Sequence, residues 1–473
     1  MARALLARRC LAAGTLGAVA AGAHTAAAIG TDVLRDGGNA FDAALAAALA
    51  ETVLLPPKCG LAGDLVALVR PAGAAGPTAL TAIGPAAAGL PALAEHTGWR
   101  PAVTGAASVG VPGAPAGYTA LAGYGRLGLA RAAEPAVGLA ERGVPWSPVC
   151  ARLAAEAASL LREHQPDGCR YQPEDRALRV GEVLRLPGLA EALRELTRAG
   201  AGLFAGPIGR DLAAYVTERG GAITPADLVG VLAETAPPET GEAGGRVLWT
   251  TPPPTYGPAL LDALAAVPPR TGSGDDDVRA LADAVRQALA RQRTGVPALS
   301  DGTSAVAAVD AEGNAVVVVH SNSFPRFGSG LVLPGWDLVL SNRAGRGFTW
   351  QPGHPNAPAA GRRPLTTLHA WALPDADGGP GLLMGATPGG EQQVPWNAQV
   401  IRRLLAGSTD EDMAAAMTEP RWELDARGRL RREGVPGELP ELGARSSHVV
   451  VRGGAGVPTA AADPRLTGAA VAA

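Results

Sequence analysis

Thr303 is the residue of this sequence whose surroundings best suit nucleophilic catalysis. The segment Asp301-Gly302-Thr303-Ser304 predicts a flexible loop that delivers Thr303 to the first position of a buried strand. A threonine hydroxyl is a weak nucleophile and needs a base. If the chain is cut before Thr303, the new α-amine, with an unperturbed pKa of roughly 7.7 to 8.0, can accept the hydroxyl proton. Gly302 would let the peptide distort so that the Thr303 hydroxyl attacks the Gly302 carbonyl. Taken alone, however, Gly-Thr before a strand is also an ordinary turn exit.

The residues after Thr303 predict a β-rich region. Two apolar runs, 304–309 and 315–319, are separated by Asp-Ala-Glu-Gly-Asn at 310–314, a composition typical of a hairpin turn. Further strands are predicted at 331–333, 338–340 and 382–384. The nucleophile would therefore lie at the start of a hairpin.

The residues before Thr303 predict mainly helices. Apolar positions recur at helical spacing in 26–34, 187–200 and 207–219, and Asn39 with Asp42 should cap another helix. Three prolines at 252–254 end this region, and a helix with an acidic start is predicted from Asp275 to about Arg293. The uncharged run 11–30 could be a signal peptide or a spanning helix. Because it is mostly Ala and Gly, a buried strand followed by a helix ending near Arg35 fits better.

Composition excludes several classes of function. The chain has 473 residues, 47% of them hydrophobic and 18% charged, and a formal net charge of -3, which favours neither disorder nor nucleic-acid binding. The cysteines are scattered, without the spacing of a zinc site or a disulfide framework. They are Cys10, Cys59, Cys150 and Cys169. No metal and no cofactor are expected.

The ordered motifs resemble those of the γ-glutamyltransferase family over nearly the whole chain. The first is Gly-Gly-Asn-Ala-Phe-Asp-Ala-Ala at 37–44. None of the motifs is specific alone, but seven follow in the family's order. The other six lie at 108–113, 220–228, 302–303, 328–330, 363–367 and 388–390.

This resemblance implies an α+β fold, the four-layer αββα sandwich of the Ntn hydrolases. It also implies maturation by cleavage between Gly302 and Thr303 into a heterodimer of residues 1–302 and 303–473. The implied nucleophile is Thr303, with Ser321 assisting self-cleavage. The remaining implied site residues are Gly389 and Gly390 as the oxyanion hole, and Thr366, Thr367 and either Asn322 or Ser323 as substrate contacts.

Several residues depart from the family's pattern. The stretch 80–85 has no arginine to clamp a glutamyl carboxylate, and Ala305 replaces the usual histidine. The family's glycine-rich run is altered at 60–64, to Gly-Leu-Ala-Gly-Asp. Arg343 and Arg346 stand where the family has a Gln or Glu and then an aspartate that binds the glutamyl amine. An arginine repels an ammonium group and cannot lose its charge. We therefore expect Arg343 and Arg346 to bind a substrate carboxylate.

The sequence thus predicts a self-processing threonine hydrolase acting on a small carboxylate-bearing substrate, with C–C bond hydrolysis in an actinobacterial natural-product pathway preferred. A γ-glutamyltransferase or glutathione hydrolase, or a cephalosporin-acylase-like amidase, is the alternative enzyme. An inactive relative kept as a binding protein is the alternative from another class. The expected partners are the small substrate and the two cleaved chains, with no nucleic acid and no membrane, and the expected location is the cytoplasm.

Overall fold

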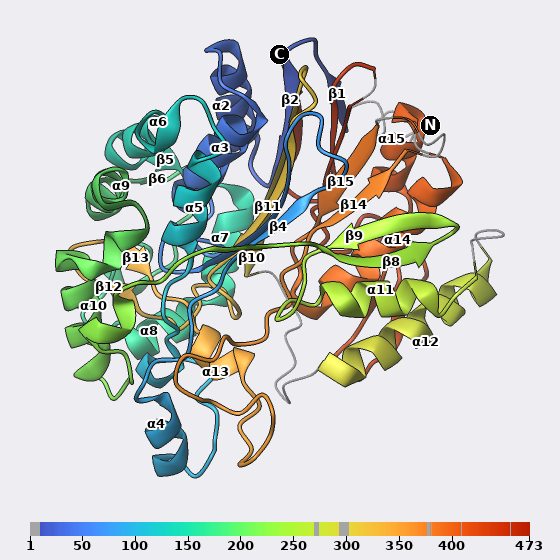
Figure 1. The fold of residues 1–473 in the computed structure, drawn as a ribbon. Coiled ribbons are helices and arrows are strands. Elements are labelled where there is room, and N and C mark those ends of the chain that lie inside the picture. Colours follow the sequence, from blue (N-terminus) through green and yellow to red (C-terminus); the bar gives the residue numbers. More distant parts are fainter. Residues whose placement is uncertain are drawn as a thin grey trace.

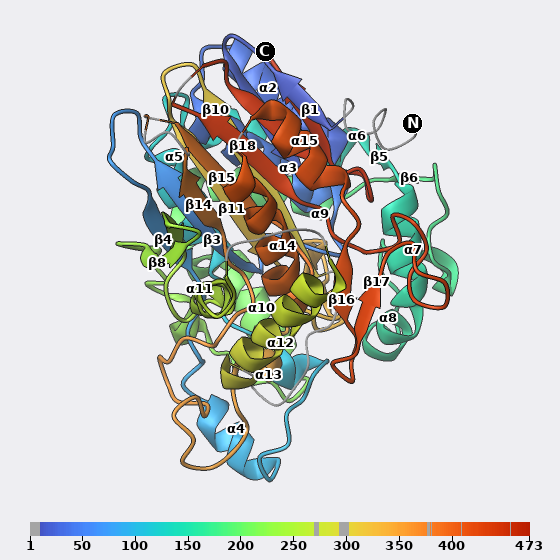
Figure 2. The same ribbon diagram turned by 90° about the vertical axis from the view of Figure 1, so that its right-hand side faces the viewer.

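Two large antiparallel sheets lie face to face and helices cover their outer surfaces (Figures 1 and 2). The computed structural model describes residues 10–268, 274–292, 302–375, 379, 381–407, 409–454 and 456–473. One seven-stranded sheet has the order β1-β19-β18-β15-β14-β9-β8, and the other has the order β20-β2-β10-β11-β3-β4-β7. This is the α+β four-layer sandwich that the family resemblance implied.

The strands of the β10 sheet are β20 (Ala469–Ala472), β2 (Gly17–Ala21), β10 (Thr303–Asp310), β11 (Ala315–Ser321), β3 (Asp64–Arg70), β4 (Thr78–Ala82) and β7 (Glu234–Ala236). The strands of the other sheet are β1 (Leu11–Ala13), β19 (Thr459–Ala462), β18 (Val449–Gly453), β15 (Leu382–Ala386), β14 (Trp371–Pro374), β9 (Arg246–Thr250) and β8 (Glu239–Ala243). Short two-stranded pairs are β5 (Val144–Pro145) with β6 (Val183–Leu184), β12 (Val332–Leu333) with β13 (Leu338–Val339), and β16 (Trp422–Leu424) with β17 (Leu430–Arg432).

The helices on the β10 side include α2 (His24–Arg35), α3 (Ala40–Leu54), α5 (Ala114–Ala122), α6 (Gly128–Arg142), α9 (Pro187–Ala199) and α10 (Pro207–Thr217). Those on the other side are α11 (Gly257–Ala265), α12 (Asp275–Gln292), α14 (Gln393–Ala406) and α15 (Asp410–Thr418). The remaining helices are α4 (Leu90–His96), α7 (Pro148–Glu156), α8 (Ala158–His164) and α13 (Arg343–Gly347). Among the described residues, no helix combines the length and the apolar character needed to cross a membrane.

Local sequence signals account for several of these elements. In α3 the Asn39 side chain accepts from Asp42 N, and the Asp42 side chain accepts from Asn39 N, so the predicted cap is a capping box. The apolar run near the amino terminus forms β2 and then α2, which ends at Arg35 as predicted. Strands β10 and β11 are rich in Ala and Val because both of their faces are buried, one by α3 and one by the facing sheet.

Both sheets draw strands from the part of the chain before Thr303 and from the part that begins with it. Residues before 303 supply β2, β3 and β4 to one sheet and β8 and β9 to the other, whereas α14 lies near the carboxyl end. The sequence periodicity missed β3 and β4 because strands buried on both faces show no polar alternation. The two parts of the chain therefore build both sheets together.

Candidate functional site

Thr303 and Ser321 lie opposite each other at one end of the β10–β11 hairpin. They are direct cross-strand partners, both are buried, and their hydroxyl oxygens are 3.1 Å apart. The Ser321 hydroxyl donates to the Gly302 carbonyl oxygen over 2.5 Å and accepts from Ser323 N over 2.8 Å. Because the only Ser321 hydroxyl proton points at Gly302, the Thr303 hydroxyl is the donor to Ser321.

This arrangement can perform self-cleavage. As Thr303 Oγ1 attacks the Gly302 carbonyl carbon, its proton can pass to Ser321 Oγ while the Ser321 proton moves to the developing oxyanion. Collapse of the intermediate breaks the Gly302–Thr303 C–N bond, and the proton on the former oxyanion passes to the leaving nitrogen, which becomes the free Thr303 amine. The Gly302 carbonyl is left as an ester on Thr303 Oγ1, and water hydrolyses this ester to release the Gly302 carboxyl end and the Thr303 hydroxyl. Asp301, the first residue of the predicted loop, lies outside the described residues.

Glycine is required at position 302 for a steric reason. A Cβ there would lie 1.6 Å from the Ser323 carbonyl oxygen, well inside contact distance. Ser323 itself has a left-handed backbone with φ of 67°, which is costly for a residue other than glycine. The loop after β11 is therefore pressed against the scissile peptide, and Ser323 contributes its backbone to that contact.

Asp64 extends the Thr303–Ser321 pair into a row across three strands. Ser321 pairs with Asp64 on β3 just as it pairs with Thr303 on β10. Directly opposed residues in antiparallel strands project to the same face about 4.5 to 5.5 Å apart. All three side chains thus face the second sheet, at one end of the three central strands of the first. Asp64 belongs to the altered glycine-rich run at 60–64, but the sequence did not predict it as a site residue.

Arg343, the first residue of α13, binds Asp64 at the end of this row. Its Nε donates to Asp64 Oδ2 over 2.6 Å, and both side chains are buried. Burial raises the pKa of Asp64, and this shift is opposed by the charge of Arg343 and by a hydrogen bond from Gly84. Gly84 belongs to the stretch 80–85 that lacks the family's arginine. Arg343 Nη2 is buried and has no hydrogen-bond partner among the described residues.

Arg346 connects this row to the other sheet. Its guanidinium lies over the Phe324 ring, 4.5 Å from the ring centroid. Burial and the neighbouring Arg343 lower the pKa of Arg346 to about 10, and Glu391 acts in the opposite direction. Glu391 follows Gly390 directly, so Arg346 lies near the predicted oxyanion turn.

Gly389 and Gly390 form that turn, between β15 and α14. Both have positive φ, 136° and 58°, and a Cβ at Gly389 would lie 2.4 Å from the Trp396 ring. Successive N–H groups in such a turn at the start of a helix form a concave site for an anion. The turn therefore has the conformation expected of the predicted oxyanion hole.

The packing of the two sheets brings this turn to the Thr303 end of β10. A Cβ on Gly453 would lie 2.1 Å from Val309 Cγ2, and Gly453 pairs with Leu382 at the start of β15. Val309 is near the far end of β10. Strands β10 and β15 thus run in opposite directions, and the end of β15 that leads into Gly389 faces the Thr303 end.

The other predicted substrate contacts have different surroundings. Asn322 is buried against Gly60 and Gly63, and its Oδ1 has no hydrogen-bond partner among the described residues. Thr366 Oγ1 accepts from Leu368 N, so this hydroxyl serves the local backbone. Thr367 Oγ1 lies 3.2 Å from the side chain of Gln393, the first residue of α14. Thr367 is therefore beside the oxyanion turn.

Comparison with known proteins agrees with this geometry. The family model described as Gamma-glutamyltranspeptidase matches residues 26–296 and 280–472. A relative from Klebsiella pneumoniae subsp. pneumoniae, oxamate amidohydrolase proenzyme, is 29% identical over 530 residues, which cover 96% of this chain and 98% of that protein.

Solved structures agree too. The cephalosporin acylase from Bacillus halodurans superimposes with a TM-score of 0.84 at 28% identity, covering 98% of this chain and 97% of that one. LmbA2991HD superimposes with a TM-score of 0.82 at 26% identity, covering 98% and 99%. The predicted family and enzyme class are thereby confirmed: the chain belongs to the γ-glutamyltranspeptidase family and is a self-processing Ntn hydrolase.

Proposed function

We propose that this enzyme uses Thr303 to hydrolyse a small substrate that carries a carboxylate close to the scissile carbonyl. The observation that carries the proposal is the row Thr303–Ser321–Asp64 with Arg343 bound at its end. Two strand spacings separate Thr303 from Asp64, roughly 10 Å between Cα atoms. The long side chain of Arg343 lies against Asp64. The space left between its guanidinium and Thr303 therefore suits a small organic acid.

In the proposed reaction the α-amine of Thr303 takes the hydroxyl proton as Oγ1 attacks the substrate carbonyl. The N–H groups of Gly389 and Gly390 stabilise the oxyanion, a contribution that typically reaches about 3 to 4 kcal/mol for one donor. Collapse breaks the bond to the leaving group, which takes the proton from the Thr303 ammonium. Water then attacks the Thr303 ester, releases the acid and restores the free hydroxyl.

Charge at the site supports an anionic substrate without an ammonium group. Arg343 Nη2 is a buried donor without a hydrogen-bond partner among the described residues, and Arg346 lies nearby. The acids Asp64 and Glu391 already act on these arginines, so neither is free to receive a glutamyl amine. The relative named for oxamate fits this pattern, because oxamate is an amide whose scissile carbonyl is bonded directly to a carboxylate.

Cleavage of a C–C bond beside a ketone, in a natural-product pathway, is the finer form of the proposal that the sequence favours. The nucleophile and the oxyanion hole would be the same, but the leaving group would be an enolate that takes its proton from the Thr303 ammonium. Arg346 favours this variant, since a partly buried guanidinium near the oxyanion turn offers N–H donors to an enolate oxygen. A γ-glutamyl hydrolase or a cephalosporin-acylase-like amidase is the competing assignment.

A substrate panel on the processed enzyme tests the proposal. We expect turnover of oxamate or of a 3-oxo acid. We also expect γ-glutamyl anilide turnover about a thousandfold below that of a typical family member, because each 1.4 kcal/mol is a factor of ten. The two probes distinguish the two reactions: turnover of the amide oxamate indicates C–N cleavage, whereas turnover of the 3-oxo acid indicates C–C cleavage. Ordinary turnover of the γ-glutamyl anilide, with no reaction on either anionic probe, would refute the anionic substrate class.

A further inference from the structure

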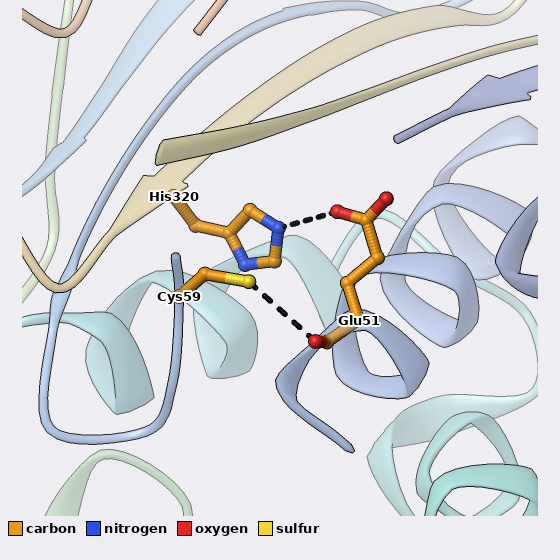
Figure 3. Close-up of side chains that lie close together, drawn as sticks. All are labelled: Glu51, Cys59 and His320. Carbon is orange, nitrogen blue, oxygen red and sulfur yellow. Dashed lines mark hydrogen bonds and ion pairs between the residues drawn. The ribbon is translucent and has the colours of Figure 1, made fainter. Parts of the chain in front are cut away.

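A fully buried polar cluster lies behind the nucleophile, on the α3 side of the β10 sheet (Figure 3). It consists of Glu51 from α3, His320 from β11, and Cys59, and their ligand-type atoms all lie within 4.8 Å of one another. Burying a carboxylate in an apolar interior is costly unless it is hydrogen-bonded. The bonds of this cluster therefore indicate what it does.

The polar atoms of the cluster are occupied by one another and by the backbone. Glu51 Oε1 accepts from Gly22 N over 2.7 Å, and Glu51 Oε2 lies 2.8 Å from His320 Nε2. His320 Nδ1 lies 2.8 Å from the Tyr118 hydroxyl. Cys59 Sγ donates to the Glu51 carbonyl oxygen over 3.6 Å, and burial raises the pKa of this thiol well above its usual value. A metal ion would have to break these bonds, so the geometry favours a closed hydrogen-bond network.

The network contacts the residues on either side of the catalytic pair. His320 directly precedes Ser321 and is the cross-strand partner of Ser304, which directly follows Thr303. Successive side chains of a strand point to opposite faces, so Ser304 and His320 face α3 while Thr303 and Ser321 face the other sheet. At Gly22 a Cβ would lie 2.5 Å from Ser304 Oγ and 3.1 Å from Glu51 Oε1. The Ser304 hydroxyl and the Glu51 carboxylate thus approach the same glycine.

Self-cleavage makes this location important. Thr303 becomes a chain end, and chain ends are poorly ordered unless they are tied down. On one side, β10 pairs with β11 from Thr303 onward, whereas on the other side its pairing with β2 begins only at Val306. The first three residues of the new chain are therefore held by β11 and by contacts of their own side chains.

We propose that Glu51 and His320 are positioning residues that hold the freed amino end of β10 in its catalytic register. The inference rests on the proposed role of Thr303 as nucleophile. The Glu51 carboxylate, on α3, binds both His320 of β11 and the backbone of Gly22, which directly follows β2. One carboxylate therefore holds both strands that neighbour β10. Neither Glu51 nor His320 touches the substrate side of the sheet, so their effect is on turnover rather than on substrate binding.

The test compares Glu51→Gln and His320→Gln with the wild type, using fully processed protein verified by mass spectrometry and counted by active-site titration. We expect kcat to fall about ten- to a hundredfold, with KM within about twofold. If the network only stabilises the core, melting temperatures fall but kcat per titrated site stays at the wild-type value. That result would overturn the proposal, as would about one equivalent of zinc in the purified enzyme.

Two further variants keep the test decisive if the Gln variants do not mature. Tyr118→Phe removes only the outer bond of the network, and Tyr171→Phe is its matched control. Tyr171 is likewise buried, and its hydroxyl donates over 2.8 Å to the Asp337 carbonyl oxygen rather than to a residue of the network. We expect Tyr118→Phe to lower kcat about threefold relative to Tyr171→Phe, and equal kcat values would refute the proposal. Activity of Thr303→Ala would instead refute the proposed function itself.

Discussion

The Ser321 hydroxyl lies within hydrogen-bond distance of two oxygen atoms that take part in the predicted self-cleavage. It is 3.1 Å from the Thr303 hydroxyl and 2.5 Å from the carbonyl oxygen of Gly302. A single short side chain can thus take a proton from the attacking oxygen and give one to the oxygen that gains negative charge. Because Thr303 and Ser321 are paired by the register of one hairpin, this relationship is fixed by the fold before any cut is made.

The Thr303→Ala variant is expected to stay a single chain, because it lacks the attacking oxygen. The wild type should give two bands in denaturing electrophoresis, with mass spectrometry placing the cut between Gly302 and Thr303. Thr303→Ser, which keeps a hydroxyl, is the control and should still process. An active wild-type preparation that remains uncut would contradict the assignment.

The Gly302→Ala variant should process at least about a hundredfold more slowly, since its Cβ would collide with the Ser323 carbonyl and displace the scissile peptide. The measurement is the rate at which uncut precursor disappears after purification. Gly202→Ala is the matched control, because a Cβ at Gly202 meets nothing within 4 Å. Equal processing rates for the two variants would show that the contact at Gly302 does not matter.

Ser321→Ala removes the hydroxyl that donates to the Gly302 carbonyl. Loss of one oxyanion donor typically costs about 2.7 to 4 kcal/mol, which corresponds to a processing rate roughly a hundred- to a thousandfold lower. Ser321→Thr retains the hydroxyl on a strand position that tolerates branching and should recover most of the rate. A wild-type processing rate for Ser321→Ala would remove Ser321 from the mechanism.

Arg346→Asp is expected to depress turnover of the anionic substrate while self-cleavage continues, because maturation uses Thr303 and its immediate neighbours. The loss of one charge-assisted bond, about 1.5 to 3 kcal/mol, lowers kcat/KM by roughly ten- to a hundredfold or more. Arg346→Lys keeps the charge and should fall less. Unchanged kcat/KM for Arg346→Asp on every probe would identify Arg346 as a structural residue.

Acid should destabilise the fold partly through His369. Burial lowers the pKa of His369 to about 4 from its ordinary 6.5, while its bond to the Thr367 carbonyl opposes the shift. The unfolded chain therefore binds this proton more tightly. The stabilisation is complete above about pH 6.5 and is lost as pH falls toward 4, by about 2 kcal/mol at pH 5.

Denaturant unfolding of the uncut Thr303→Ala chain at pH 7.5 and pH 5 measures this effect. Adding His369→Gln should reduce the difference between the two pH values by about 2 kcal/mol. The exposed His24 provides the control, because His24→Gln should leave the difference as it was. A pH dependence that persists in full without His369 would assign the acid sensitivity to other groups.

Local signals predicted the site's hairpin and several helices. The runs at 304–309 and 315–319 became β10 and β11, and Asn39 with Asp42 capped α3 as their spacing indicated. Such features depend on residues close together in the chain. The positions of Gly389 and Gly390 came from family motifs, and their positive φ values agree with the predicted turn.

The long-range contacts could not be predicted in this way. Asp64 and Arg343 are 279 residues apart, and Glu51 and His320 are 269 apart. No periodicity links such positions, and only the sheet order brings them together. One signal was available for the first pair: an acid appears at Asp64, in the altered glycine-rich run, while a cation appears at Arg343 where the family has a Gln or Glu. A compensating change of charge is what a new contact would produce.

The interleaved strand order has a consequence for how the mature enzyme behaves in a cell. On the predicted cleavage, β10 would belong to the second chain while sitting between β2 and β11, one neighbour from each chain, and β20 would cross back to β2. The halves could separate only by dismantling both sheets. Two variants of the enzyme expressed in the same cell would consequently not exchange their cleaved chains. Each mature molecule would keep the two chains that were made from one precursor.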